Sequence, residues 1–152
     1  MRTKNDGKEL ERKVAEALRV HQEKNRSVFH RFADTTSAAG NLVQAQPGDF
    51  LWLHYFGPAV LVECKSTATG ESILDLVKAS KSSRRQIPCH RLWHIAGHKS
   101  IYIWGNLTTR EVCVYEGKSV IEAYKNNNTA PLLRLGNGCM ESMYTTLSGI
   151  TL

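Results

Sequence analysis

The chain lacks the features that mark membrane-spanning and exported proteins. No apolar run approaches membrane-spanning length, because Lys, Glu or His interrupts each candidate. The first residues, MRTKNDGKELERK, contain no apolar stretch of the kind found in signal peptides. The four cysteines are widely spaced and form no CxxC pair, which is typical of reduced thiols. We therefore expect a cytoplasmic protein, in the host cytoplasm if the chain is viral, with no membrane partner.

The chain also lacks internal repeats and any obvious linker. Its 152 residues, 41% of them hydrophobic and 22% charged, suffice for one domain with a real core. We expect a main domain over 1–125 and an unassigned tail over 126–152, which belongs to the same domain or to a dimer interface. The net charge of +6 and the pI of about 9.3 favour polyanionic partners if the cations surround a site.

Hydrophobic periodicity predicts an α/β fold with a mixed central β-sheet flanked by helices. In the first helix, Leu10, Val14, Ala17 and Leu18 form an inward stripe. Pro88 suits the first turn of a helix that Gly97 ends. The expected helices are 7–24, 71–81, 88–96 and 119–125, and the expected strands are 27–33, 49–55, 58–65, 100–105 and 111–117.

The segment QPGDFLWLHYFGPAVLVECKST, residues 46–67, predicts a buried hairpin centred on Phe56 with charged groups at its open end. Asp49 and Glu63 are each seven residues from Phe56, so they should lie nearly opposite each other. Lys65 projects from the same face as Glu63. Because opposed carboxylates repel, a fold that tolerates them usually supplies a cation, and the candidates are Lys65 and a hard divalent metal with oxygen ligands. The alternative is a hairpin end whose charges are solvated by water.

A third carboxylate is expected on the first helix. Glu11, Val14 and Leu18 occupy positions i, i+3 and i+7 of this helix, so Glu11 continues the buried stripe. Glu9 and Glu16 lie on the side that is more exposed to water. Glu11 is therefore a candidate outer ligand or water-positioning group. On spacing alone, an ordinary glutamate at the helix edge is nearly as good an interpretation.

Asp49, Glu63 and the backbone carbonyl of Cys64 could hold a metal ion, with Glu11 acting through water. Mg²⁺, for which Mn²⁺ can substitute, suits such a sparse site because it retains several waters and binds substrate phosphate. The metal would lower the pKa of bound water and neutralise charge on phosphorus. Lys65 could orient or deprotonate the water, or stabilise the transition state. The predicted chemistry is metal-dependent hydrolysis of a phosphodiester, with no small-molecule cofactor.

These residues resemble the PD-(D/E)xK nuclease superfamily, and within it the archaeal-type Holliday junction resolvases, including those of phages. Pro47-Gly48-Asp49 and Glu63-Cys64-Lys65 are similar to the metal-binding hairpin, and 7–12, GKELER, is similar to the family's Gly-x-x-x-Glu-Arg helix motif. Arg31, Ser37 and Gln86 match further positions of the family pattern. The glycine between Pro47 and Asp49 is a departure from it.

The resemblance implies a restriction-endonuclease-like fold and a homodimer that cuts four-way DNA junctions in recombination and repair, with Glu11, Asp49, Glu63 and Lys65 as catalytic residues. The predicted DNA contacts combine positions of the family pattern with the basic residues near the site: Lys8, Arg12, Arg31, Ser37, Ser66, Lys81, Arg84, Arg85 and Gln86. The alternatives are another nuclease of the superfamily, acting as a restriction, repair, flap or duplex-end enzyme, and a non-catalytic basic DNA-binding module.

His90, His94 and His98 recur at intervals of four residues beside Cys89. Such spacing can align ligands of a structural zinc ion on a helix. Since Gly97 should end the helix and no second ligand pair is present in the sequence, we expect ordinary surface histidines instead.

Overall fold

We describe the fold from a computed structural model, which defines residues 6–32, 46–55, 57–127 and 130–152. Its helices are α1 (Asp6–Asn25), α2 (Ile73–Ala79), α3 (Lys81–Ile95), α4 (Gly117–Lys125), the 3₁₀ helix η1 (Met140–Ser142) and α5 (Met143–Ser148). Its strands are β1 (Ser27–Arg31), β2 (Phe50–His54), β3 (Ala59–Thr67), β4 (Lys99–Asn106), β5 (Glu111–Glu116) and β6 (Arg134–Cys139). Residues 33–45, which include the last position of the predicted strand over 27–33, lie outside the described residues.

The six strands form one mixed sheet in the order β1-β2-β3-β4-β5-β6. Only the β3–β4 pair is parallel, and the chain makes this connection through α2 and α3. The other neighbours are antiparallel. The sequence-based prediction of an α/β protein with a mixed central sheet flanked by helices is therefore confirmed.

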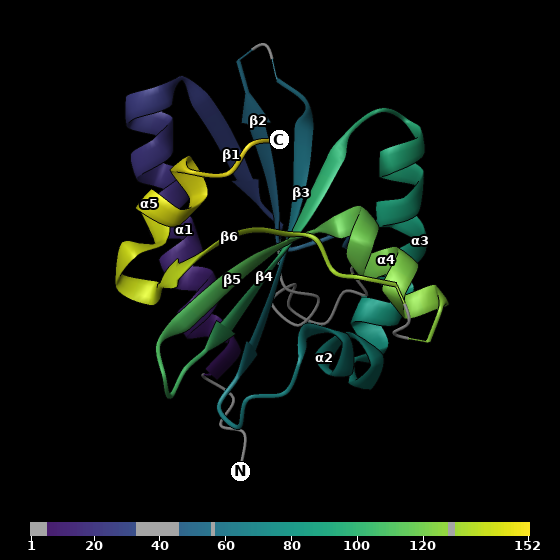
Figure 1. The fold of residues 1–152 in the computed structure, drawn as a ribbon. Coiled ribbons are helices and arrows are strands. Elements are labelled where there is room, and N and C mark those ends of the chain that lie inside the picture. Colours follow the sequence, from purple (N-terminus) through teal and green to yellow (C-terminus); the bar gives the residue numbers. More distant parts are fainter. Residues whose placement is uncertain (1–5, 33–45, 56, 128–129) are drawn as a thin grey trace, which may run out of the picture.

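Helices cover both faces of the sheet (Figure 1). On one face, α1 and α5 pack against a core that includes Leu10, Val14, Phe50 and Trp52, all of which are buried. On the other face, α2, α3 and α4 enclose a second core around Tyr102 and Val120. The predicted stripe of α1 is correct, since Leu10, Val14, Ala17 and Leu18 are all buried.

The β2–β3 hairpin has the predicted register. Phe50 pairs with Val62, and Leu53 pairs with Ala59, so each pair is symmetric about position 56. Asp49 directly precedes the first of these pairs and Glu63 directly follows it. Local alternation and the turn thus bring two distant carboxylates to the same end of the hairpin.

The prediction for Pro88 was wrong. Helix α3 begins at Lys81, and Pro88 lies inside it. The helix starts early because the hydroxyl of Ser80 caps it, accepting a 3.2 Å hydrogen bond from the amide of Ser83. Since Ser80 also ends α2, the predicted helix over 71–81 stops at Ala79. Pro88 is tolerated at an exposed position, at the cost of one helical hydrogen bond.

The described part of the unassigned tail from residue 130 to residue 152 contributes to the sheet and to the first core. Strand β6 pairs with β5, and α5 packs against α1. Met140, Met143 and Leu147 are buried beside α1 and the sheet.

The four cysteines all lie in the described part of the chain and are free thiols, as predicted. Among the helices in the described ranges, none has the length and apolar character required to cross a bilayer.

Candidate active site at the β2–β3 hairpin

The backbone holds Asp49 firmly at the entrance of β2. Its amide donates a 2.9 Å hydrogen bond to the carbonyl of Val62, and its carbonyl accepts a 2.9 Å bond from the amide of Phe32. Its side chain reaches the opposite strand, where Oδ2 accepts a 2.6 Å bond from the amide of Cys64. Asp49 therefore faces the Glu63-Cys64-Lys65 run, as predicted from the symmetry of the hairpin.

Burial makes this carboxylate pair costly. Glu63 is only 1% exposed, and Asp49 is partly buried. Burial raises the pKa of Asp49 well above its usual range, and repulsion from Glu63 adds to the rise. Burial also raises the pKa of Glu63, against the opposing effect of Lys65. Two acidic groups thus share a site that disfavours negative charge.

Lys65 supplies one positive charge to this site by pairing with Oε1 of Glu63. Burial by itself lowers the pKa of Lys65, but attraction to Glu63 and Asp49 outweighs burial, so the pKa is raised. Lys65 is therefore a protonated ammonium group at neutral pH. We call Asp49, Glu63 and Lys65 the hairpin cluster.

Glu11 of α1 adds negative charge to the hairpin cluster, since it contributes to the raised pKa values of both Asp49 and Glu63. It also accepts a 2.7 Å hydrogen bond from Arg31 of β1. Its side chain is 19% exposed, against 39% for Glu9 and 45% for Glu16. Glu11 is thus the least exposed of the three helix glutamates, in keeping with its place on the stripe.

The environment of one Glu63 oxygen fits a cation between Asp49 and Glu63. Oε2 of Glu63 is buried and has no hydrogen bond of ordinary geometry with the described residues. Gly48 lies beside that oxygen, since a Cβ atom there would be 3.7 Å from it, which is an ordinary contact, and 3.0 Å from the carbonyl oxygen of Val62, which is a tight one. The close approach of the Val62 backbone therefore favours glycine at position 48.

The side chains alone do not make a closed metal site. Within the described ranges, no group of three or more His, Cys, Asp and Glu side chains could hold an ion. The predicted set contains two direct carboxylate ligands and a backbone carbonyl, so water or phosphate oxygens would complete it. This composition suits Mg²⁺ or Mn²⁺ and is unlike a structural zinc site.

Sequence reasoning missed two buried polar groups beside the hairpin cluster. Tyr102 pairs with Glu63 across β3 and β4, and its ring lies 5.1 Å from that of His90. The prediction that His90 is a surface residue was wrong, because it is fully buried, and burial lowers its pKa to about 4. The four-residue spacing of Gln86 and His90 is the signal that could have shown both to lie on one inward face of α3.

The predicted DNA contacts are distributed over α1, β1, β3 and α3. Gln86 is buried and donates a 3.3 Å hydrogen bond to the carbonyl of Gln46, while Ser66 lies partly buried on β3. Ser37 lies outside the described residues. The remaining predicted contacts are all exposed cationic side chains: Lys8, Arg12, Arg31, Lys81, Arg84 and Arg85.

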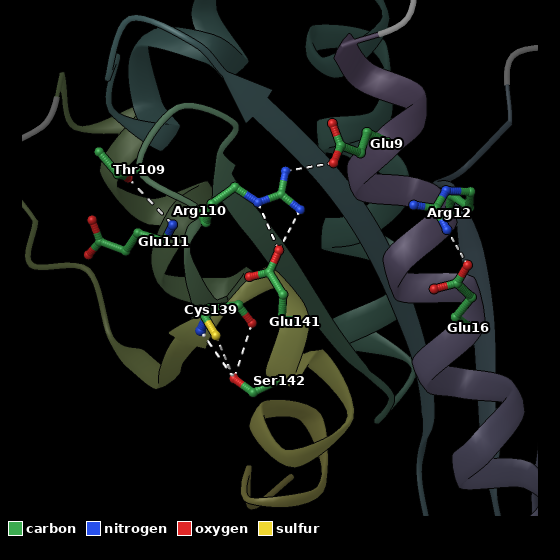
Figure 2. A network of polar contacts seen from close by, with 9 residues as sticks. All are labelled: Glu9, Arg12, Glu16, Thr109, Arg110, Glu111, Cys139, Glu141 and Ser142. Carbon is green, nitrogen blue, oxygen red and sulfur yellow. Dashed lines mark hydrogen bonds and ion pairs between the residues drawn. The ribbon is translucent and has the colours of Figure 1, made fainter.

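A second cluster of two carboxylates and one cation lies on the surface (Figure 2). Arg110, in the turn between β4 and β5, donates a 2.6 Å hydrogen bond to Glu9 of α1. It also donates bonds of 2.9 and 2.7 Å to Glu141 of η1. We call Glu9, Arg110 and Glu141 the surface cluster. It ties α1 to the segment between β6 and α5.

In comparisons with known proteins, no protein-family model and no curated protein matches the chain. The fold and the residues of the hairpin cluster therefore carry the functional argument.

Proposed function

We propose that the protein is a metal-dependent DNA endonuclease of the PD-(D/E)xK type, with a restriction-endonuclease-like fold and four-way junctions as its preferred substrate. The proposal rests on the approach of Asp49 to the buried Glu63, since both pKa values are raised and Oε2 of Glu63 has no hydrogen bond of ordinary geometry with the described residues, which favours a bound cation in addition to Lys65. A purely structural hairpin end would not require two carboxylates in this environment.

Asp49, Glu63 and the carbonyl of Cys64 would hold Mg²⁺ or Mn²⁺, with Glu11 acting through water. When bound there, the ion supplies an acidified water and neutralises charge on the phosphate. The backbone bonds of Asp49 and the Cys64 amide fix its carboxylate before any ion arrives. This preorganisation limits the rearrangement that binding requires.

Of the roles open to Lys65, electrostatic stabilisation is the best supported. Its raised pKa means that it already carries its proton at neutral pH and cannot accept another. An ammonium held beside the carboxylates can orient a phosphate oxygen and stabilise developing negative charge.

The preference for junctions and the homodimer rest on the resemblance of residues 7–12 and of the hairpin motif to the resolvases. A two-fold dimer would present two equivalent sites to a substrate of matching symmetry. Five exposed cations of α1 and α3 would contact backbone phosphates and contribute affinity without reading sequence: Lys8, Arg12, Lys81, Arg84 and Arg85.

The test is incubation with Mg²⁺ and labelled DNA of four shapes, namely a four-way junction, a flap, plain duplex and single strands. We expect metal-dependent cuts, strongest on the junction, and none with Asp49→Asn. The matched control is Glu141→Gln, which removes a carboxylate from the surface cluster. Cutting of flap or duplex in preference to the junction would indicate another nuclease of this type. DNA binding without cleavage of any substrate would leave a binding module.

A further inference from the structure

A basic pocket lies away from the hairpin cluster, between the end of α3, the start of β4 and α4. Its volume is about 450 Å³, within the range of small-molecule sites. Helices α3 and α4 lie side by side over this part of the sheet (Figure 1). Four cations line the pocket together with a single carboxylate: Arg91, Lys99, Lys118, Lys125 and Glu122.

The side chains that line this pocket carry an excess of positive charge, and Glu116 lies close enough to act on His94. Four cations and one carboxylate give a net charge of +3 with the histidines neutral. In the described part of the chain, the ion pairs involve other residues, so none of these four cations has a carboxylate partner. Cations that converge from three segments and outnumber the nearby carboxylates favour an anionic ligand.

His94 lines the pocket beside both acidic and basic side chains. It is half-buried, and its Nε2 lies 2.8 Å from the hydroxyl of Ser100. Burial is the main reason that its pKa is lowered, while Glu116 and Glu122 oppose the shift and Lys99 and Lys118 add to it. The floor of the pocket includes buried Ile121, so an anion there would be partly shielded from water.

We propose that the basic pocket is a binding site for a phosphate-bearing ligand with two or more adjacent phosphate groups. Lysine ammonium groups and a guanidinium fork form charge-assisted hydrogen bonds with phosphate oxygens. Lys99 precedes Tyr102, the partner of Glu63, by three residues, or about 10 Å along β4. The pocket is thus separate from the hairpin cluster, and phosphate binding there does not depend on the proposed nuclease activity.

The phosphates could belong to a DNA backbone or to a free polyphosphate such as a nucleotide, and inorganic pyrophosphate serves as a probe for both. Titration calorimetry at fixed ionic strength, without divalent metal, should show binding to the wild type. The variant Lys99→Gln/Lys118→Gln should bind at least tenfold more weakly. The matched control Arg19→Gln/Lys24→Gln removes two exposed cations from α1, on the other face of the sheet, and should bind as the wild type does.

A second pocket variant, Arg91→Gln/Lys125→Gln, guards against a folding defect, since both side chains are exposed. It should show the same weakening. Pyrophosphate binding equal to that of the α1 control in both pocket variants would overturn the proposal, as would no binding to the wild type at millimolar pyrophosphate.

The salt dependence of DNA binding separates the two sources of phosphate. If DNA occupies the pocket, removing two phosphate contacts should reduce the slope of log K against log salt by about 1.8 units. If a free polyphosphate occupies it, the pocket variants should match the α1 control in this slope while still losing pyrophosphate. Either result leaves the metal and cleavage tests of the hairpin cluster untouched.

Discussion

The hairpin cluster and the surface cluster have the same formal composition, two carboxylates and one cation, yet their surroundings give them opposite properties. Burial raises the pKa values of Asp49 and Glu63, whereas hydrogen bonds from Arg110 lower the pKa of Glu141. In the surface cluster, Arg110 donates to both carboxylates (Figure 2). In the hairpin cluster, Oε2 of Glu63 is buried without a partner of ordinary geometry.

This difference separates a structural ion pair from a candidate functional site. The guanidinium of Arg110 joins two exposed carboxylates and completes their charge balance with fixed geometry. The single ammonium of Lys65 pairs with one oxygen of Glu63, and Asp49 forms no ion pair with the described residues. Perturbed acids in such surroundings are typical of catalytic and metal-binding positions. Substitutions of equivalent groups in the two clusters test this difference.

The largest expected effect is the loss of cleavage in Asp49→Asn. Losing a metal ligand should remove several kcal/mol of transition-state stabilisation, which corresponds to about a thousandfold in rate. Single-turnover cleavage of a junction measures this effect. Glu141→Gln should stay within about twofold of the wild type. Comparable losses in the two variants would remove the distinction between the clusters.

The next effect concerns the two cations. Lys65→Ala should reduce cleavage about a hundredfold, because an ammonium near the developing charge is lost, while DNA affinity changes little. It should also destabilise the fold by about 3–5 kcal/mol at neutral pH, since Glu63 is left buried without its partner. Urea unfolding should show a smaller loss for Arg110→Ala, whose partners are exposed. A larger loss for Arg110→Ala would contradict the assignment of burial as the cause.

The third prediction concerns the pH dependence of stability without metal. For Asp49 and Glu63, whose ordinary pKa values are 3.8 and 4.5, the folded pKa is raised. The two carboxyl groups therefore make their full contribution to the free energy of unfolding below those ordinary pKa values. This contribution is lost as the pH rises through the pKa values of the folded protein. Glu141 behaves oppositely. Because its pKa is lowered, its contribution to the free energy of unfolding is lost as the pH falls below 4.5.

Asp49→Asn should accordingly stabilise the metal-free protein at neutral pH by about 1–3 kcal/mol, because one buried ionisable group is removed. For the same reason, the free energy of unfolding of this variant should fall less steeply as the pH rises above 4.5. Urea unfolding at several pH values measures this change. In Glu141→Gln, the free energy of unfolding should fall above pH 4.5 as it does in the wild type. An Asp49→Asn variant that is less stable than the wild type at neutral pH would show that the two carboxylates are not in conflict.

The smallest expected effect separates two glutamates of α1. Glu11→Ala should reduce cleavage about tenfold, as expected for an outer group that acts on a metal site. Glu9→Ala should leave cleavage unchanged, because Glu9 belongs to the surface cluster. Parallel assays of both variants measure the difference. A stronger effect of Glu9→Ala would mean that the wrong face of α1 had been assigned to the site.

Local sequence patterns were sufficient for the hairpin and for α1. In the hairpin, alternation and the turn determine which residues face each other, so the approach of Asp49 to Glu63 followed from counting residues. The 3.6-residue period likewise predicted the buried side of α1. Both features depend on neighbours close in sequence.

Other features depend on contacts between distant segments. Strand β6 contains Gly136 and Gly138, which weaken any local strand signal, yet a Cβ atom at Gly138 would lie 2.2 Å from Oγ1 of Thr146. Glycine there permits α5 to pack closely on β6, which no local pattern predicts. The bond between Arg110 and Glu9 spans 101 residues and was equally invisible in the sequence.

The most direct test of the central claim is the binding of Mn²⁺ to the protein without DNA, measured by titration calorimetry. We predict that the wild type and Glu141→Gln bind the ion with equal affinity and that Asp49→Asn loses this binding. Equal binding by all three proteins, or no binding by the wild type, would contradict the claim that Asp49 and Glu63 share a divalent ion.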